Sequence, residues 1–245
     1  ALQETGAFVC NLEDEGPGAD VADLVINALY RSRLAAPHVH SGEPYFCLRN
    51  EFRASRPHEI RDEVKNVLLS FGGTDPADLT RRCLDAIDDV CAQRGIGIAI
   101  ITGFGYAHAQ ALADRVATAR AAVTLLPTVT VISQHMRAAD ICLTSYGRTL
   151  FELASLGTPT IAMAQNEREL THTFVHPENG VVALGLGTEV TPHKLLEAFT
   201  QMCDSRLFRE TASHAMRRTN LANGVENVID LLMQSFRARD GRKAT

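Results

Sequence analysis

The sequence predicts an α/β fold with a Rossmann-type parallel sheet. From residue 64 onward, short apolar runs rich in β-branched residues alternate with longer amphipathic stretches that carry apolar residues at three- and four-residue spacing. Glycine-containing turns follow two of the apolar runs, in "SFGGTDPADLT" and "SYGRTLFELASLGTP". Because strands that alternate with helices are typical of βαβ units, the sheet should be parallel and covered by helices.

The elements follow from this alternation in chain order. Strands are expected at residues 64–71, 96–102, 122–126, 141–145, 160–164 and 181–184. Helices are expected between them at residues 77–93, 107–120, 147–156 and 168–175, and at the end of the chain at residues 192–203, 207–219 and 225–236. The last residues, 237–245, are expected to fray.

Residues 1–58 have a different pattern. "GAFVCNLED" and "ADLVINALY" each indicate a strand that ends on polar residues, and links rich in Pro and Gly separate them. A doubly wound domain normally opens with a strand and a glycine-rich turn, which this segment lacks. We therefore expect residues 1–58 to be the remaining part of a truncated N-terminal α/β domain, with an upstream portion missing, and residues 59–245 to form a complete C-terminal domain.

The composition excludes several classes of partner. The 24 basic and 29 acidic residues give a net charge of -5, which disfavours nucleic acid. No run of about 18 apolar residues is present, so no membrane span is expected. The six cysteines lie far apart without a CxxC pair, which indicates buried thiols in a reducing, cytoplasmic compartment.

No metal or cofactor is expected. The closest histidine pairs are His38 with His40 and His172 with His176. The second pair has helical i, i+4 spacing only if a helix continues to Pro177, and clustered Cys and His ligands are otherwise absent from the sequence.

The first candidate site is the "SFGGTDPADLT" turn. Gly72 and Gly73 allow close approach of a ligand to the backbone. Thr74 or Asp75 can cap a helix that begins at Pro76, which would leave the N-terminal amides of that helix for a diphosphate. The alternative is a tight strand-to-helix turn with a capping aspartate and no ligand.

The second candidate site is the stretch at residues 145–159. Ser145 and Gly147 end a strand and begin a helix, Arg148 and Thr149 occupy its first turn, and Glu152 follows. A carboxylate at the carboxyl end of a parallel sheet can accept hydrogen bonds from both hydroxyls of a ribose, while the amides and the arginine neutralise phosphate. The alternative is a solvated helix glutamate, which the apolar neighbours of Glu152 disfavour.

A third cluster follows the next strand in "AQNERELTH". Gln165, Asn166, Glu169 and His172 could line the same edge of the sheet. They could equally be a polar helix start, with Asn166 as N-cap and Glu169 at the third position. The "TGFGYAH" stretch at residues 102–108 is another glycine-containing loop, and a lone GxG is a weak signal.

Together these motifs resemble a known group. "SFGGTDPADLT", "AADICLTSYGRTLFELASLGTPTIAMAQNERE" and "NLEDEGPGADVADLVINALY" are similar to the UDP-sugar hydrolases of the pseudaminic acid pathway and to their spore-coat-polysaccharide relatives, proteins of the GT-B glycosyltransferase fold. The spacing from Glu152 to Gly157 and Pro159 also resembles that of the peptidoglycan N-acetylglucosaminyltransferase. By this resemblance, Glu152 would bind the uridine ribose.

The resemblance also implies roles for the flanking residues. Residues 145–149 would bind the diphosphate, and Gln165 and Asn166 would lie on the sugar side of a UDP-sugar. In the hydrolases of the group, water cleaves a UDP-activated diacetamido sugar at its anomeric carbon. The histidine expected as base in those enzymes lies in an N-terminal glycine-rich loop that this sequence lacks, so we assign no catalytic residue.

Three functions follow from the resemblance. The first is binding of a UDP-amino sugar for hydrolysis in surface-polysaccharide or nonulosonic acid biosynthesis. The second is transfer of the sugar to an acceptor. The third is a non-catalytic nucleotide-sugar-binding domain within a larger, cytidylyltransferase-containing protein.

Overall fold

The computed structural model describes residues 5–127, 129–219 and 221–243, the last four by their backbone alone. The chain forms two compact units. The first unit contains the residues up to Arg49, the segment Thr171–Phe174 and the residues after 220. The second unit contains residues 50–170 and 175–219. In the described ranges, no helix is long and apolar enough to cross a bilayer.

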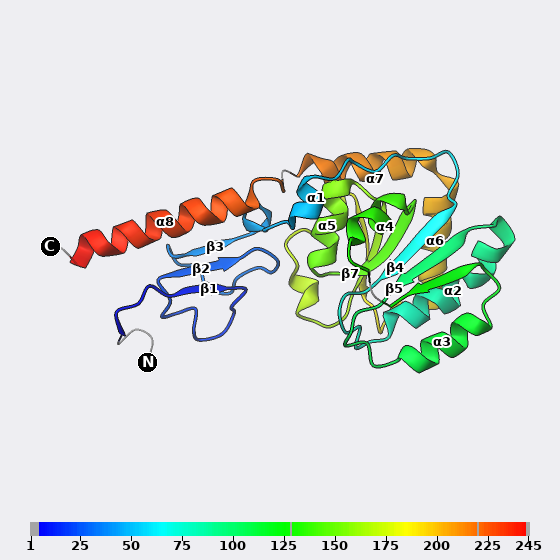
Figure 1. Cartoon of the computed structure of the whole chain (residues 1–245), viewed down its shortest axis with the longest axis horizontal. Helices are drawn as coiled ribbons and strands as arrows, with labels where there is room; N and C mark the ends of the chain where they lie inside the picture. Colours follow the sequence, from blue (N-terminus) through cyan, green and yellow to red (C-terminus); the bar gives the residue numbers. More distant parts are fainter. Residues whose placement is uncertain (1–4, 128, 220, 244–245) are drawn as a thin grey trace. The chain divides into compact units, whose positions relative to one another are not determined.

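The second unit is built on a six-stranded sheet in which every pairing is parallel (Figure 1). Its strands are β4 (Asn66–Ser70), β5 (Gly97–Ile101), β6 (Val123–Leu126), β7 (Ile141–Ser145), β8 (Thr160–Ala164) and β9 (Val181–Leu186). They lie in the order β6-β5-β4-β7-β8-β9. This is the Rossmann strand order, and the order reverses between β4 and β7. The prediction of a parallel α/β sheet is confirmed.

Helices cover both faces of this sheet (Figure 1). They are α2 (Leu79–Arg94), α3 (Ala109–Ala117), α4 (Ile132–Ala138), α5 (Arg148–Leu156), α6 (Pro192–Asp204) and α7 (Arg206–Arg218). Alternate residues of the strands, such as Val67 and Leu69, pack with Leu84 of α2 and Phe199 of α6 in one core cluster. This alternation reflects the two-residue period of a strand. Helices α4 and α5 contact the sheet as well, and α7 packs on α5.

Two helical segments differ from the sequence predictions. Helix α4 was not predicted, because it is only seven residues long and its N-cap, Val131, offers no side-chain oxygen to mark the start. The helix expected at residues 168–175 is wrong. The 3₁₀ turn Glu169–Thr171 takes its place, since the backbone of Thr171 and Thr173 bonds with that of Arg31 and Leu29 instead. A second 3₁₀ turn, Pro177–Asn179, follows.

The first unit is a three-stranded parallel sheet with one long helix. Its strands, β1 (Cys10–Leu12), β2 (Leu24–Asn27) and β3 (Val39–Ser41), lie in chain order, and β3 was too short to be predicted. Helix α8 (Gly224–Lys243) packs on β2 and on the 3₁₀ turn Glu43–Tyr45, and runs through residues expected to fray. Residues 244–245 and 1–4 lie outside the described residues.

The contacts divide the chain differently from the expected boundary near residue 58. Helix α8 joins the first unit, although it follows every element of the second unit in the sequence. A hydrogen bond from the Asn227 side chain to the Pro44 carbonyl, 2.8 Å long, is one of the interactions that hold α8 there. The assignment of the two parts to an N-terminal and a C-terminal domain of a larger fold stays a prediction.

Candidate functional site

The candidate site lies in the second unit, at the carboxyl edge of the sheet where the strand order reverses. Ligands of open parallel sheets bind outside the carboxyl ends of the strands at such a reversal. The loops after β4, β7 and β8 meet here. The strands themselves are tied together by a 2.7 Å hydrogen bond from the Thr144 hydroxyl in β7 to the Ser70 carbonyl in β4.

The loop after β4 is held by a buried carboxylate. Asp75 is 3 % exposed, and its two oxygens accept hydrogen bonds from the amides of Leu79 (2.9 Å) and Thr80 (2.8 Å). Both Asp75 and Asp78 adopt left-handed backbone angles, with φ values of 40° and 52°. Such angles are uncommon outside glycine and concentrate at sites where the surrounding structure enforces them.

This arrangement corrects the interpretation of the "SFGGTDPADLT" turn. Helix α2 begins at Leu79 rather than near Pro76, and Asp75 occupies two of its first amides, so those amides do not face a ligand. The capping role considered for Asp75 is confirmed. Gly72, Gly73 and Thr74 are exposed, and a Cβ atom added at either glycine would meet nothing within 4 Å. The backbone of this turn is therefore open to a ligand.

Two side chains after β8 bind the loops after β4 and β7. The Gln165 side chain donates to Asp75 Oδ1 (2.7 Å) and accepts from the amide of Ala77 (3.2 Å). Glu169 Oε2 accepts from the amides of Gln165 (2.8 Å) and Tyr146 (3.2 Å). The structure thus brings Gln165 and Glu169 to the same edge as the glycine turn.

The two remaining residues of the third cluster lie differently. Asn166 is exposed, and its side-chain oxygen accepts from the Glu169 amide at 3.2 Å, as in the capping alternative but without an α-helix. His172 belongs to the first unit, where its buried ring packs edge-on against Tyr30, with ring centroids 5.7 Å apart.

Burial changes the acidity of Glu169. Its half-buried carboxylate loses hydration, which raises the pKa above the ordinary value, while the two amide hydrogen bonds oppose this effect. Glu169 is thus held by its Oε2 atom and remains partly exposed.

Helix α5 carries the residue that the sequence singled out most strongly. Gly147 is the N-cap and has no side chain to accept from the first amides, Arg148 is exposed, and Ser145 and Thr149 flank the turn. Glu152 is only 6 % exposed, between Phe151 and Leu153, which are fully buried. The alternative of a solvated surface glutamate is therefore wrong.

The loop after β5 packs directly on the glycine turn. A Cβ atom on Gly103 would lie 2.4 Å from the Cα atom of Gly73, so only glycine permits this approach. The Gly105 amide donates to the Gly73 carbonyl (3.1 Å), and the Tyr106 hydroxyl donates to Asp78 Oδ1 (2.5 Å). Sequence reasoning missed Tyr106, since nothing in its spacing indicates a partner 28 residues away.

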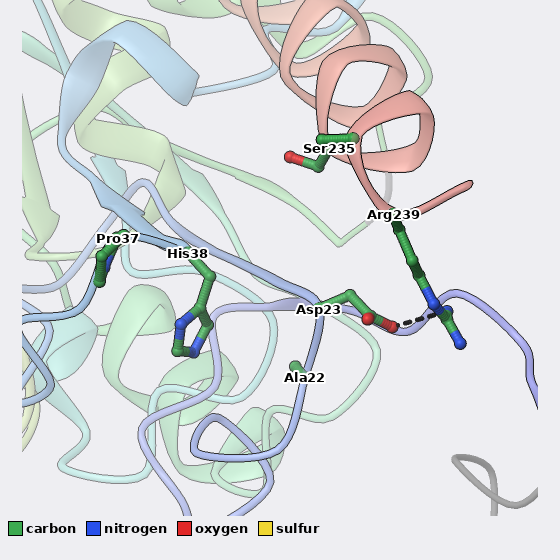
Figure 2. Close-up of a pocket in the computed structure, with 7 residues that line it drawn as sticks. Ala22, Asp23, Pro37, His38, Ser235 and Arg239 are labelled. Carbon is green, nitrogen blue, oxygen red and sulfur yellow. Dashed lines mark hydrogen bonds and ion pairs between the residues drawn. The ribbon is translucent and has the colours of Figure 1, made fainter. Parts of the chain in front are cut away.

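Two cavities bear on the location of the site, one beside this edge, at the starts of α2 and α6, and one in the first unit. One, of about 310 Å³, lies between α2 and the start of α6 and is mainly apolar, with lining residues that include Leu79, Met163, Val190 and Leu195. The other, of about 550 Å³, is in the first unit (Figure 2), where Asp23 pairs with Arg239 of α8 at 2.9 Å and His38 lies nearby. Asp23 and His38 precede β2 and β3, so this cavity lies at the amino edge, away from the edge that binds ligands in parallel sheets.

No group of three or more potential metal-ligating side chains occurs in the ranges that the structure describes. His38 and His40 belong to the first unit. The arrangement at the carboxyl edge offers backbone amides, an arginine and carboxylates, which suit a phosphorylated ligand with hydroxyl groups.

Comparison with known proteins agrees with this fold. Residues 67–230, about two thirds of the chain, match the glycosyltransferase family 28 C-terminal domain. The chain therefore belongs to this glycosyltransferase family. It is 24 % identical over 242 residues to the spore coat polysaccharide biosynthesis protein SpsG of Bacillus subtilis, a match that covers 95 % of this chain and 71 % of SpsG.

Solved structures show the same fold at low identity. The match to MurG of Acinetobacter baumannii has a TM-score of 0.61 at 18 % identity and covers 88 % of this chain and 61 % of MurG. The match to S. aureus TarM, in complex with fondaparinux, α-GlcNAc-glycerol and UDP, has a TM-score of 0.64 at 11 % identity and covers 89 % and 45 % of the two chains.

These matches confirm the GT-B-like fold and the resemblance to spore-coat polysaccharide proteins. They do not confirm the finer resemblance to the hydrolases of the pseudaminic acid pathway. The chain spans less than two thirds of the length of MurG and of TarM.

Proposed function

We propose that the second unit binds the nucleotide part of a UDP-sugar at the carboxyl edge between β4 and β7, and that the protein transfers the sugar to an acceptor in polysaccharide biosynthesis. Membership of a glycosyltransferase family supports the reaction class. The similarity to SpsG, a spore coat polysaccharide biosynthesis protein, supports the process, and the UDP complex of TarM supports the nucleotide.

The observation that carries the proposal is the burial of Glu152 in α5, the helix that starts at the strand reversal. A carboxylate at this edge of the sheet can accept hydrogen bonds from two neighbouring hydroxyl groups. A ribose supplies two neighbouring hydroxyl donors, and the N-terminal amides of α5 supply the positive end of the helix dipole. In the proposal, Glu152 accepts hydrogen bonds from the ribose.

The diphosphate would lie beside the N-terminus of α5 and the glycine turn. The N-terminus of α5 contributes Ser145, Gly147, Arg148 and Thr149, and the glycine turn contributes Gly72, Gly73 and Thr74. Because Asp75 already occupies the first amides of α2, α5 is the better anion site of the two helices. The positive charge of Arg148 and the helix dipole would stabilise UDP as it leaves.

The sugar would lie toward the loop after β8. Gln165 and Glu169 are fixed there by backbone amides and by Asp75, and Asn166 is exposed beside them. Amide and carboxylate side chains are suited to sugar hydroxyls, which both donate and accept hydrogen bonds. His172, which the sequence placed with this group, is left out of the proposal because it packs in the first unit.

Isothermal titration calorimetry with UDP, CDP and GDP tests the nucleotide site. We expect UDP to bind best, and Glu152→Ala to weaken its binding by about 1–3 kcal/mol, because a hydrogen bond to a buried charge is lost. Glu167→Ala, at an exposed glutamate after β8, is the matched control and should leave UDP affinity unchanged. Equal affinities of the wild type and Glu152→Ala would remove Glu152 from the site.

The reaction is tested on the full-length protein with a UDP-amino sugar. Turnover that requires an added acceptor supports transfer. UDP and free sugar released without an acceptor would show hydrolysis instead, and UDP-sugar binding without release of UDP under either condition would show a binding domain.

A further inference from the structure

One aromatic side chain at the candidate site is not explained by packing. Phe104, in the loop after β5, is 95 % exposed. Other large apolar side chains on the surface are less exposed, such as Leu207 at 72 % and Leu12 at 65 %. A fully exposed phenylalanine buries little apolar surface within the chain, so its ring is available for contact with a ligand.

The loop that carries Phe104 is fixed in place. Its two neighbours both touch the glycine turn: Gly103 packs on Gly73, and Gly105 donates a hydrogen bond to the Gly73 carbonyl. A Cβ atom on Gly105 would lie 2.9 Å from the Thr74 side chain. The residues on both sides of Phe104 therefore hold its loop against the glycine turn, which is proposed to contact the diphosphate.

The order of the strands tells which part of the ligand reaches Phe104. Along the carboxyl edge, the loop after β8 carries Gln165, α5 after β7 carries Glu152, the glycine turn follows β4, and Phe104 follows β5. The base is bonded to the ribose, whereas the sugar is bonded to the far end of the diphosphate. With the ribose at Glu152 and the sugar toward β8, the base points away from β8, toward the ends of β4 and β5. Phe104 follows β5, two strands from β7, which is about 10 Å at the usual spacing of strands.

We propose that Phe104 is the platform on which the uracil base of the nucleotide stacks, an inference that rests on the proposed nucleotide site. Every base has a flat π-face, and stacking of a base on an aromatic side chain is favourable without base-specific hydrogen bonds. Phe104 thus positions the base and adds affinity, whereas Glu152 recognises the ribose.

A fluorescent variant tests this contact directly, because the chain contains no tryptophan. Phe104→Trp places a single indole at the platform, and we expect UDP to change its emission in a saturable way with the dissociation constant found by calorimetry. Leu207→Trp is the control. Leu207 lies next to Arg206, which pairs with Asp62 before β4 at the opposite edge of the sheet, and its indole should not respond to UDP.

Calorimetry of Phe104→Ala distinguishes the possible occupants. Stacking predicts that UDP and UDP-N-acetylglucosamine both bind on the order of tenfold more weakly than to the wild type, since both carry the base. Phe104→Tyr, which keeps the ring, should restore most of the affinity. Weakening of the UDP-sugar alone would place the ring against the sugar and overturn the proposal.

Unchanged affinity for both ligands would overturn it as well, and would leave Phe104 as a contact for an acceptor or another protein. These outcomes are separate from failure of the proposed function. If the wild type binds no UDP, the nucleotide site itself is wrong, whereas UDP binding that depends on Glu152 but not on Phe104 rejects only the platform.

Discussion

Two buried carboxylates at the carboxyl edge have different tasks. Asp75 uses both oxygens on groups of the protein, namely the amides of Leu79 and Thr80 and the side chain of Gln165. Glu152 lies in the second turn of α5, among fully buried apolar residues. The apolar neighbours of Glu152 in the sequence were enough to disfavour a solvated role. The partners of Asp75 were only partly predictable, because Gln165 is 90 residues away.

At the same scale, His58 shows how burial makes stability depend on pH. The ring is 5 % exposed, Nδ1 lies 2.8 Å from the Arg137 carbonyl, and Nε2 is buried with no hydrogen-bond partner among the described residues. Loss of hydration lowers the pKa of His58 below its ordinary 6.5, although the hydrogen bond to Arg137 acts in the opposite direction.

The sign of the effect follows from this lowered pKa. As the pH falls below about 6.5, His58 binds a proton in the unfolded chain but stays neutral in the folded chain. Protonation therefore favours the unfolded chain, and the free energy of unfolding decreases. We expect His58→Gln, which keeps a donor for Arg137, to lose this part of the decrease. Urea unfolding of both proteins between about pH 7 and pH 5 measures it. If the free energy of unfolding decreased equally with pH in the wild type and in His58→Gln, His58 would not contribute to this pH dependence.

Among the elements, the strands were the most predictable. Residue ranges 141–145 and 160–164 agree with β7 and β8 at both ends, because these strands are fully buried and their apolar runs are continuous. The helix expected at residues 168–175 was wrong because its backbone bonds to a segment distant in sequence, which local periodicity does not reveal. The start of α2 moved to Leu79 because two left-handed residues extend the turn.

Helix α2 should depend on the Asp75 carboxylate. Asp75→Ala removes the acceptor for two helix amides and leaves the buried Gln165 side-chain NH2 group without its acceptor. Loss of a cap costs about 0.5–2 kcal/mol and an unsatisfied buried group about 1–3 kcal/mol. We expect the free energy of unfolding, measured in urea, to fall by about 1.5–5 kcal/mol in total.

The matched control for this change is Asp89→Ala. Asp89 lies on the same helix, and its ion pair with Arg120 is exposed, with both side chains about two thirds accessible or more. Exposed pairs of this kind contribute little, so we expect a change within about 0.5 kcal/mol. An equal effect of the two substitutions would show that the Asp75 network does not stabilise the start of α2.

For the whole molecule, the alternation of strands and helices predicted a parallel sheet, and the carboxyl edge was predicted to hold the site. The order β6-β5-β4-β7-β8-β9 follows from which helix covers which face, which no single stretch of sequence contains. The same holds for α8, whose apolar residues predicted a helix but not its place in the first unit. Packing between segments distant in the sequence determines both the strand order and the place of α8.

The central claim is that UDP binds where the strand order reverses in the second unit, and amide hydrogen exchange with and without saturating UDP tests it most directly. The account predicts slower exchange in the glycine turn at residues 72–74 and in residues 147–152 at the start of α5, with no change in the first unit around His38 and Arg239. Protection confined to the cavity of the first unit, or spread over neither segment, would contradict it.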